Sequence, residues 1–137
     1  MGLPRAQTTD FSSLRCFVTG AAPFAPEKFK EATRLFGPVM CEGYGLTECG
    51  MPLTIKKPAD YLLPGGGFDE AVLRSAGRAV MQARVEIMDE SGRLLPPGER
   101  GEIVVQSGMV MREYYRNPQE TEAAGRFGWR HTGDVAI

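Results

Sequence analysis

The chain contains 137 residues, and its 16 lysine and arginine residues nearly balance its 17 aspartate and glutamate residues, giving a formal net charge of −1. This balance excludes nucleic acid and anionic membrane as partners held by bulk electrostatic attraction. The length is enough for one domain or two small lobes with a hydrophobic core. Glycine and proline are abundant, with 17 and 10 residues, which predicts many turns and short strands.

The cysteine content and the apolar stretches bear on the cellular compartment. Cys16, Cys41 and Cys49 are odd in number and include no Cys-x-x-Cys pair, so neither a disulfide framework nor a zinc site is predicted. A reducing cytoplasm suits such thiols. No uninterrupted apolar stretch approaches the roughly 18 residues of a membrane span. We therefore expect a cytoplasmic protein without a membrane span.

The first part of the chain predicts a strand, a helix and a second strand. Residues 14–18 form a short apolar run that is typical of a buried strand. Pro26 stands at a favourable first helical position, and apolar residues recur at helical spacing as far as Phe36. Residues 39–41 follow as a second strand. The unit is about 30 residues long, the size of a parallel βαβ element.

The second part of the chain changes to short strands. Residues 83–88 alternate between apolar and polar side chains, which predicts a half-buried strand. A second strand is predicted at residues 101–106 and a short helix at residues 119–124. We expect the apolar and aromatic residues of the segment between them to belong to the core of this part: Met109, Met111, Tyr114 and Tyr115.

These patterns predict an α/β plus β fold. We expect residues 1–57 to be the end of a parallel-sheet α/β lobe, residues 58–76 to be a loop or crossover, and residues 77–137 to form a small β-barrel-like lobe. The chain ends on an apolar run, which is typical of a truncated segment.

Two loops are the first candidates for a ligand site. In an open parallel sheet, ligands bind beyond the carboxyl ends of the strands, where the sequence places Gly20-Ala21-Ala22-Pro23 and Glu42-Gly43-Tyr44-Gly45-Leu46-Thr47-Glu48. The glycines beside Tyr44 leave its ring open to a flat ligand such as a purine base. Thr47 offers a hydroxyl group, and Glu48 offers a carboxylate of the kind that Mg²⁺ prefers beside phosphate.

An alternative interpretation of the second loop is purely structural. The glycines would form a tight turn, Tyr44 would belong to the core, and Thr47 with Glu48 would cap a following helix. Judged from this one short motif alone, the structural interpretation is the more frequent outcome.

A third candidate is Thr132-Gly133-Asp134, interpreted as a glycine turn. Its carboxylate is suited to accept hydrogen bonds from both hydroxyls of a ribose, although an ordinary turn is the commoner role of such a tripeptide. His131 is the only histidine of the chain. It has no sequence partner for a metal cluster or a nucleophile, so it is interpreted as structural.

Taken in order, five segments of the chain resemble successive motifs of the adenylate-forming (AMP-forming) acyl-CoA synthetase superfamily, and they are most similar to bacterial fatty-acid–CoA ligases. The resemblance covers nearly the whole chain from Asp10 onward. It is carried by residues 14–23, by Glu42-Gly43-Tyr44-Gly45-Leu46-Thr47-Glu48, by residues 98–103, by residues 115–121 and by residues 128–134.

This resemblance implies a two-step reaction with ATP, Mg²⁺ and coenzyme A. A carboxylic acid, by the closest resemblance a fatty acid, would form an acyl-adenylate, and coenzyme A would then displace AMP. The resemblance assigns Gly20, Ala21, Ala22 and Pro23 to the adenine and acyl pocket. It assigns Tyr44 to adenine stacking and Thr47 to the phosphate and the acyl carboxylate. Glu48 would hold Mg²⁺, and Asp134 would bind the ribose.

The resemblance also implies that the chain is an internal part of a larger ligase. The phosphate loop expected upstream of Gly20 and the small C-terminal domain with its lysine are not found in this sequence, so we expect the chain alone to be inactive and able to self-associate. Glu113 replaces a glycine that is frequent in the family. Alternatives are an adenylation domain of peptide synthesis, a luciferase-like relative, or a non-catalytic ligand-binding or interaction module.

Overall fold

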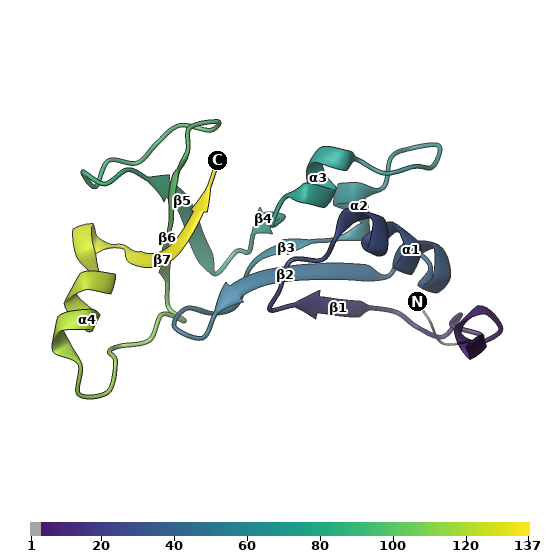
Figure 1. The fold of residues 1–137 in the computed structure, drawn as a ribbon, viewed down its shortest axis with the longest axis horizontal. Helices are drawn as coiled ribbons and strands as arrows, with labels where there is room; N and C mark the ends of the chain where they lie inside the picture. The colour runs from purple at the N-terminus through teal and green to yellow at the C-terminus, as the bar shows by residue number, and fades with distance from the viewer. Residues whose placement is uncertain (1–3) are drawn as a thin grey trace. The chain divides into compact units, whose positions relative to one another are not determined.

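The computed structural model describes residues 4–137 and divides into two compact units. Unit 1 holds the described residues up to Tyr44 together with Thr54–Arg78, and unit 2 holds Gly45–Leu53 and Ala79–Ile137. In chain order the helices and strands (Figure 1) are β1 (Phe17–Gly20), α1 (Pro26–Phe36), β2 (Met40–Leu46), β3 (Gly50–Lys56), α2 (Pro58–Tyr61), α3 (Glu70–Arg74), β4 (Arg78–Ala79), β5 (Ala83–Met88), β6 (Gly101–Ser107), α4 (Pro118–Ala124) and β7 (Arg130–Ala136).

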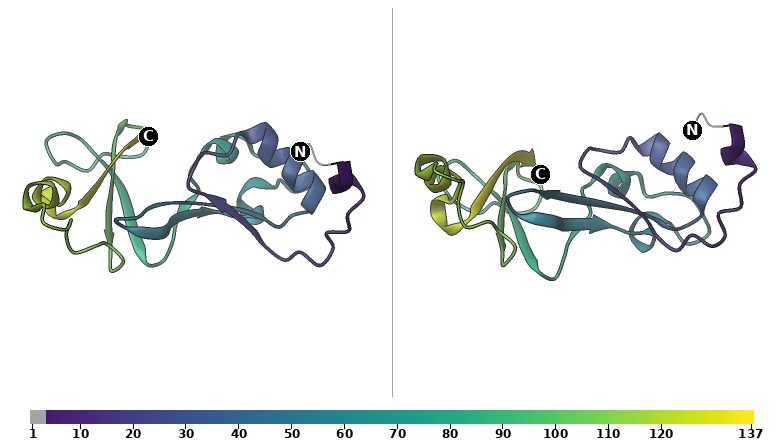
Figure 2. Two further views of the ribbon diagram at one scale, coloured as in Figure 1. Left: turned by 60° about the horizontal axis from the view of Figure 1, so that its bottom comes forward. Right: turned by 90° about the horizontal axis from the view of Figure 1, so that it is seen from below.

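The predicted strand–helix–strand unit is confirmed. Strands β1 and β2 are parallel, with Phe17 opposite Met40 and Gly20 opposite Gly43. Helix α1 connects them and lies on one side of the two strands (Figure 2). The first sheet has the strand order β1-β2-β3-β4. The carboxyl ends of β1 and β2 therefore reach the same edge of this sheet, as the sequence predicted.

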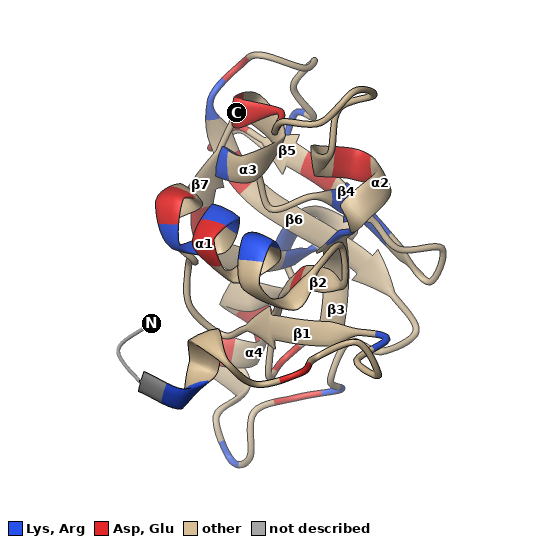
Figure 3. Ribbon diagram, turned by 90° about the vertical axis from the view of Figure 1, so that its right-hand side faces the viewer, with Lys and Arg blue, Asp and Glu red and all other residues tan. Residues whose placement is uncertain are grey.

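Helix α1 matches the predicted bounds because its sequence separates an apolar face from a charged one. Phe29 and Ala32 are fully buried, while Lys28 and Glu31 form an exposed ion pair of 2.8 Å. Figure 3 shows the mixture of basic and acidic residues along this helix. The buried face packs into the core of unit 1, which consists of Phe29, Ala32, Met40, Tyr61 and Leu73.

The prediction of a buried first strand is wrong in two respects. The strand begins at Phe17 rather than at Leu14, and its apolar side chains are exposed, with Val18 62% accessible. Strand β1 is the outermost strand of its sheet. It has a neighbouring strand on only one side among the described residues, and the described residues do not cover its apolar side chains fully.

The second predicted loop is mostly strand. Strand β2 continues through Leu46, and a turn at residues 47–49 leads directly into β3. No helix follows Glu48, so the alternative in which Thr47 and Glu48 cap a helix is wrong. Strand β3 was not predicted.

The segment expected to be a loop or crossover, residues 58–76, contains the short helices α2 and α3. Asp69 starts α3 by accepting hydrogen bonds from the amides of Ala71 and Val72. This arrangement satisfies two of the amides that the first turn of a helix leaves without a partner.

Unit 2 contains an antiparallel sheet with the order β5-β6-β7. Its core is formed by Met88, Val104 and Trp129. The sheet is open, and the described residues contain no closed barrel, so the expected barrel-like form is not confirmed. Three strands are too few to close on themselves, since even a small, partly open barrel such as the OB-fold uses about five.

No helix within residues 4–137 is long and apolar enough to cross a membrane.

Candidate functional site

In unit 1, Glu42 links strand β2 to the segment that follows β1. Its Oε1 atom accepts a hydrogen bond of 3.0 Å from the amide of Phe24. Its Oε2 atom lies 2.7 Å from Nζ of Lys56, a side chain that is 1% exposed. Both carboxylate oxygens of Glu42 therefore have partners within the protein, and the bond from Phe24 holds the end of the loop 20–23 beside strand β2.

The loop itself is open to solvent. Ala21, Ala22 and Pro23 are exposed, and Ala21 has a φ of 65°. This is the left-handed region that residues other than glycine rarely adopt. An observed outlier of this kind is typical of sites where backbone shape serves binding. The register places Gly20 directly opposite Gly43, so unit 1 brings these two predicted site residues together.

Gly45, in unit 2, has a structural reason to be glycine. A Cβ atom at this position would lie 2.6 Å from the carbonyl oxygen of Gly50 and 2.6 Å from Cγ of Met51. Any larger residue would force strands β2 and β3 apart. Tyr44 itself is half-buried in β2, so part of its side chain is accessible.

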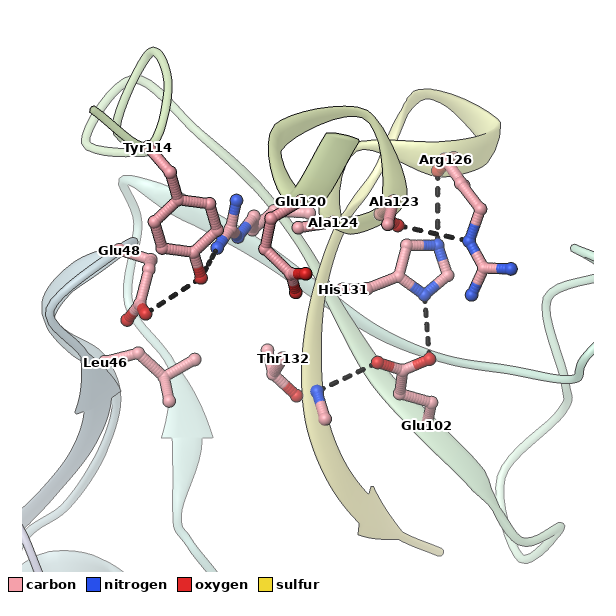
Figure 4. A pocket seen from close by; sticks show the side chains of 12 residues that line it. Leu46, Glu48, Glu102, Tyr114, Glu120, Ala123, Ala124, Arg126, His131 and Thr132 are labelled. Atoms are coloured by element: carbon pink, nitrogen blue, oxygen red, sulfur yellow. Dashed lines mark hydrogen bonds and ion pairs between the residues drawn. The ribbon is translucent and has the colours of Figure 1, made fainter. Parts of the chain in front are cut away.

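A pocket of about 300 Å³ lies within unit 2. Two of the predicted motifs meet there, because Leu46 and Glu48 come from the β2–β3 hairpin and Thr132 and Gly133 come from β7. Figure 4 shows Leu46, Glu48 and Thr132 around the pocket. The lining consists of Leu46, Glu48, Glu102, Tyr114, Glu120, Ala123, Ala124, Arg126, Arg130, His131, Thr132 and Gly133.

One side of the pocket carries a chain of hydrogen bonds that ends on Glu48. The Tyr114 hydroxyl donates to Oε1 of Glu48 at 3.0 Å and accepts from Nη2 of Arg130 at 2.7 Å. Arg130 is 8% exposed, and its guanidinium carbon lies 5.0 Å from the centre of the Tyr114 ring. Its Nε atom is buried without a hydrogen-bond partner. Tyr114 thus fixes the direction of the Glu48 carboxylate.

A second carboxylate stands on the opposite side of the pocket. Oε2 of Glu102 lies 2.7 Å from Nδ1 of His131, and Oε1 accepts a hydrogen bond of 2.9 Å from the amide of Gly133. Burial raises the pKa of the Glu102 carboxyl, but the hydrogen bonds from His131 and Gly133 outweigh it and hold the pKa below the usual 4.5. Glu102 is therefore ionised at neutral pH.

The remaining predicted residues lie at the surface of unit 2. Thr47 is exposed in the turn between β2 and β3. Asp134 is exposed in β7, and its amide donates to Oγ1 of Thr132 at 3.1 Å. The prediction of a glycine turn at residues 132–134 is wrong, because all three residues lie within strand β7.

Sequence reasoning missed several residues of this pocket. Tyr114 was assigned to the core, but its hydroxyl points to Glu48. Glu102 and Arg130 were not singled out, and His131 was interpreted only as structural. Arg130 offered one usable signal, since it directly follows the apolar Trp129, and a charge beside a core residue usually has a partner.

The chain by itself does not form a closed metal site. The described residues contain no group of three or more histidine, cysteine, aspartate or glutamate side chains suited to hold an ion. A single carboxylate nevertheless fits Mg²⁺ bound with a nucleotide, since one or two carboxylates together with substrate phosphates are its usual ligands. Glu48, with its direction fixed by Tyr114, is chemically suited to that role.

Comparisons with known proteins agree with the motifs. A family model described as AMP-binding enzyme matches residues 2–115. A medium/long-chain-fatty-acid–CoA ligase of Mycobacterium tuberculosis is 38% identical over 133 residues, which cover 97% of this chain and 22% of that protein. A feruloyl-CoA synthase of an Amycolatopsis species is 36% identical over 133 residues, covering 97% of this chain and 25% of that protein.

Solved structures show the same similarity. An amide bond synthetase from Marinactinospora thermotolerans has a TM-score of 0.87 and 35% identity, over 98% of this chain and 26% of that one. The chain spans about a quarter of the length of the curated relatives named above. With a family model that matches most of its length, the chain belongs to the AMP-binding enzyme family.

Proposed function

We propose that this chain is part of an AMP-forming carboxylate–CoA ligase and that its acid substrate is a fatty acid. In the first step the substrate carboxylate attacks the α-phosphate of ATP, which releases pyrophosphate and forms an acyl-adenylate. In the second step the thiol of coenzyme A attacks the acyl carbonyl and releases AMP. The proposal is supported by the 38% identity to a fatty-acid–CoA ligase over 97% of the chain.

One observation from the structure carries the proposal. Glu48 and Gly133 are 85 positions apart in the sequence, yet both line the same pocket of unit 2. These are the two motifs that the resemblance assigns to the phosphates and to the ribose. A pocket that joins a hydroxyl, carboxylates and arginine side chains is suited to a charged and polyhydroxylated ligand such as a nucleotide.

Within this proposal, each predicted residue has a role. Asp134 binds the ribose hydroxyls, Tyr44 stacks on adenine, and Thr47 donates a hydrogen bond to phosphate. Glu48 would hold Mg²⁺, which when bound offsets phosphate charge. Glu42 acts by holding the loop 20–23, because both of its oxygens already have protein partners.

The proposal includes the cellular setting and the behaviour of the chain alone. We place the reaction in the cytoplasm, in keeping with three free cysteines. Residues 1–57 and 77–137 would then be parts of two lobes, the second of them barrel-like in a longer chain. Because the positioning of the triphosphate carries much of the catalysis in phosphoryl-type transfer, the 137-residue chain should not catalyse adenylation by itself.

The test is the exchange of labelled pyrophosphate into ATP, with and without fatty acids of graded length. An intact ligase that carries this chain should show exchange that depends on the acid, and the 137-residue chain should show none. Formation of the CoA thioester is then measured directly. An intact protein that binds ATP but shows no acid-dependent exchange would contradict the proposal and favour a binding module.

The acceptor in the second step is tested separately, because a similar structure belongs to an amide bond synthetase. The acyl-adenylate is formed first, and coenzyme A or a simple amine is then added. Thioester formation with coenzyme A supports the proposal. Transfer only to the amine would leave the adenylation step in place and overturn the choice of coenzyme A.

A further inference from the structure

Strand β7 contains an irregularity at the predicted ribose-binding segment. Glu102 pairs with Val135 and Val104 pairs with His131, so Ile103 alone stands opposite Thr132, Gly133 and Asp134. Three residues facing one form a bulge in β7. Gly133 has a φ of 78°, which is a conformation that favours glycine and turns the backbone out of the regular strand.

A bulge leaves backbone groups without their usual partners in the strand ladder, and side chains replace them here. The Thr132 hydroxyl donates to the carbonyl oxygen of Ile103 at 2.8 Å and accepts from the amide of Asp134 at 3.1 Å. The amide of Gly133 donates to Oε1 of Glu102 at 2.9 Å. The shape of the bulge therefore depends on two side chains, and only one of them is charged.

Glu102 also holds the residue that precedes the bulge. Its Oε2 atom lies 2.7 Å from Nδ1 of His131, whose side chain is 8% exposed. On the far side of the ring, Nε2 lies 3.2 Å from the carbonyl oxygen of Arg126. Figure 4 shows the ring held between these two oxygens. An ionised carboxylate and a backbone carbonyl both only accept hydrogen bonds, so each ring nitrogen of His131 faces an acceptor.

We propose that Glu102 is a positioning residue, which fixes the bulge at residues 132–134 and thereby the direction in which Asp134 is presented to the nucleotide. The identity of the ligand as a nucleotide rests on the proposed function. The structural part of the proposal, that Glu102 fixes the bulge, rests on the contacts of Glu102 alone. Bulges beside binding sites commonly redirect a side chain, and a side chain that is held from a neighbouring strand keeps its direction without the ligand.

The structural part is tested by NMR on the 137-residue chain. His131 is the only histidine, so its ring ¹⁵N signals need no assignment by mutation. In the wild-type chain, the Nδ1 signal should show the hydrogen bond to the Glu102 carboxylate, and the Gly133 amide should exchange slowly with solvent. In Glu102→Gln the side-chain amide would face Nδ1 as a donor, so the Nδ1 signal should shift.

Two further variants make this result interpretable. Glu86→Gln is the matched control, because Glu86 lies on strand β5 of the same sheet and pairs with the exposed Arg84. It should leave the His131 and Gly133 signals unchanged. Glu102→Ala should remove the protection of the Gly133 amide. If the Glu102 variants do not fold, the test relies on the wild-type chain. A Gly133 amide that exchanges fast in the wild-type chain would overturn the proposal.

The functional part is measured in the intact ligase as the dependence of rate on ATP concentration. Glu102→Ala should raise the KM for ATP about tenfold with a smaller change in kcat, the size expected for a lost hydrogen bond to a charged group. Glu102→Gln, which keeps an acceptor for the Gly133 amide, should recover part of that loss, and Glu86→Gln should match wild type.

Asp134→Asn separates failure of this inference from failure of the proposed function. If Asp134→Asn raises the KM for ATP while Glu102→Ala does not, Glu102 has no positioning role and the inference is overturned. If neither variant changes the KM, while the NMR signals change as expected, the ribose role of Asp134 fails and the structural role of Glu102 stands. A rise in both KM values supports the two together.

Discussion

Nζ of Lys56 and Oε2 of Glu42 lie 2.7 Å apart in an ion pair that is almost completely buried, with 1% and 14% of the two side chains exposed. The same ammonium donates to the carbonyl oxygens of Leu73 and Ser75 at 2.9 and 3.1 Å. The pair therefore connects β2, β3 and the end of α3. Through the amide of Phe24 it also holds the loop after β1.

Lys56→Met should strongly destabilise unit 1. Removing one partner of a buried pair leaves the other charge without compensation, which costs about 3–5 kcal/mol. The double variant Lys56→Met with Glu42→Gln should recover part of this loss. Lys28→Met is the control, because Lys28 forms only an exposed pair. Urea unfolding of the 137-residue chain measures all three, and equal effects of Lys56→Met and Lys28→Met would contradict the prediction.

Glu48 and Tyr44 should affect different kinetic constants in the intact ligase. In the proposed function, a metal held by Glu48 would offset charge that develops on the phosphates during attack, so Glu48→Gln should lower kcat with a smaller effect on the KM for ATP. Stacking of adenine on Tyr44, as proposed, would be equal before and during the reaction, so Tyr44→Ala should mainly raise the KM. Steady-state pyrophosphate release across ATP concentrations distinguishes the two. Turnover of Glu48→Gln at the wild-type rate would disprove the metal role.

Tyr114→Phe should act on the reaction through Glu48. The change keeps the ring, which lies 5.0 Å from the Arg130 guanidinium carbon, and it removes the hydroxyl that donates to Glu48 and accepts from Arg130. We expect a decrease in kcat and a raised requirement for Mg²⁺, since the carboxylate loses its fixed direction. The control is Tyr115→Phe, because the Tyr115 side chain is 83% exposed. A Mg²⁺ titration of activity, together with melting curves, compares the two; identical Mg²⁺ dependence would refute the prediction.

Asp89 should stabilise unit 2 in a way that depends on pH. The Ser91 hydroxyl and the Arg93 amide donate to its carboxylate, and these bonds, the first of them foremost, lower its pKa from 3.8 to about 2. Because the folded-state pKa lies below the unfolded value, the stabilisation is complete above the unfolded pKa and is lost as the pH falls through the folded one.

The comparison for this pH dependence is between Asp89→Asn and Glu90→Gln. Asp89→Asn should be less stable than wild type at neutral pH, and the difference should shrink as the pH is lowered below 3.8. Glu90→Gln changes a neighbouring exposed charge and should have little effect at either pH. Unfolding in urea at several pH values gives the measurement. A difference that stays constant down to the lowest pH would show that Asp89 acts by some other means.

The 137-residue chain should self-associate in solution. Strand β1 is the outermost strand of its sheet, and Val18 on it is 62% exposed. An exposed apolar strand with unpaired backbone groups is a site for pairing with another chain. Light scattering should show a mass that increases with concentration, and Val18→Lys should reduce the increase. A monomer at all concentrations would contradict the prediction.

Local sequence pattern determined the elements whose burial follows a simple period. Helix α1 has the predicted bounds at both ends, because apolar spacing and the prolines and glycine around it act within a few residues. The alternation of residues 83–88 likewise predicted the bounds of β5, but not its burial, because Met88, which the alternation grouped with Arg84 and Glu86, is in the core. The order of the motifs, which needs no geometry, was enough to indicate the family.

Tertiary structure decided the arrangement of the pocket. Glu48 meets Tyr114 across 66 positions, and Glu102 meets Gly133 across 31. Neither pair leaves a local pattern, because the partners come together only when separate strands and loops pack. The bulge in β7 is of the same kind: residues 132–134 look like a turn in the sequence, and only the pairing of β7 with β6 makes them a strand held by Glu102.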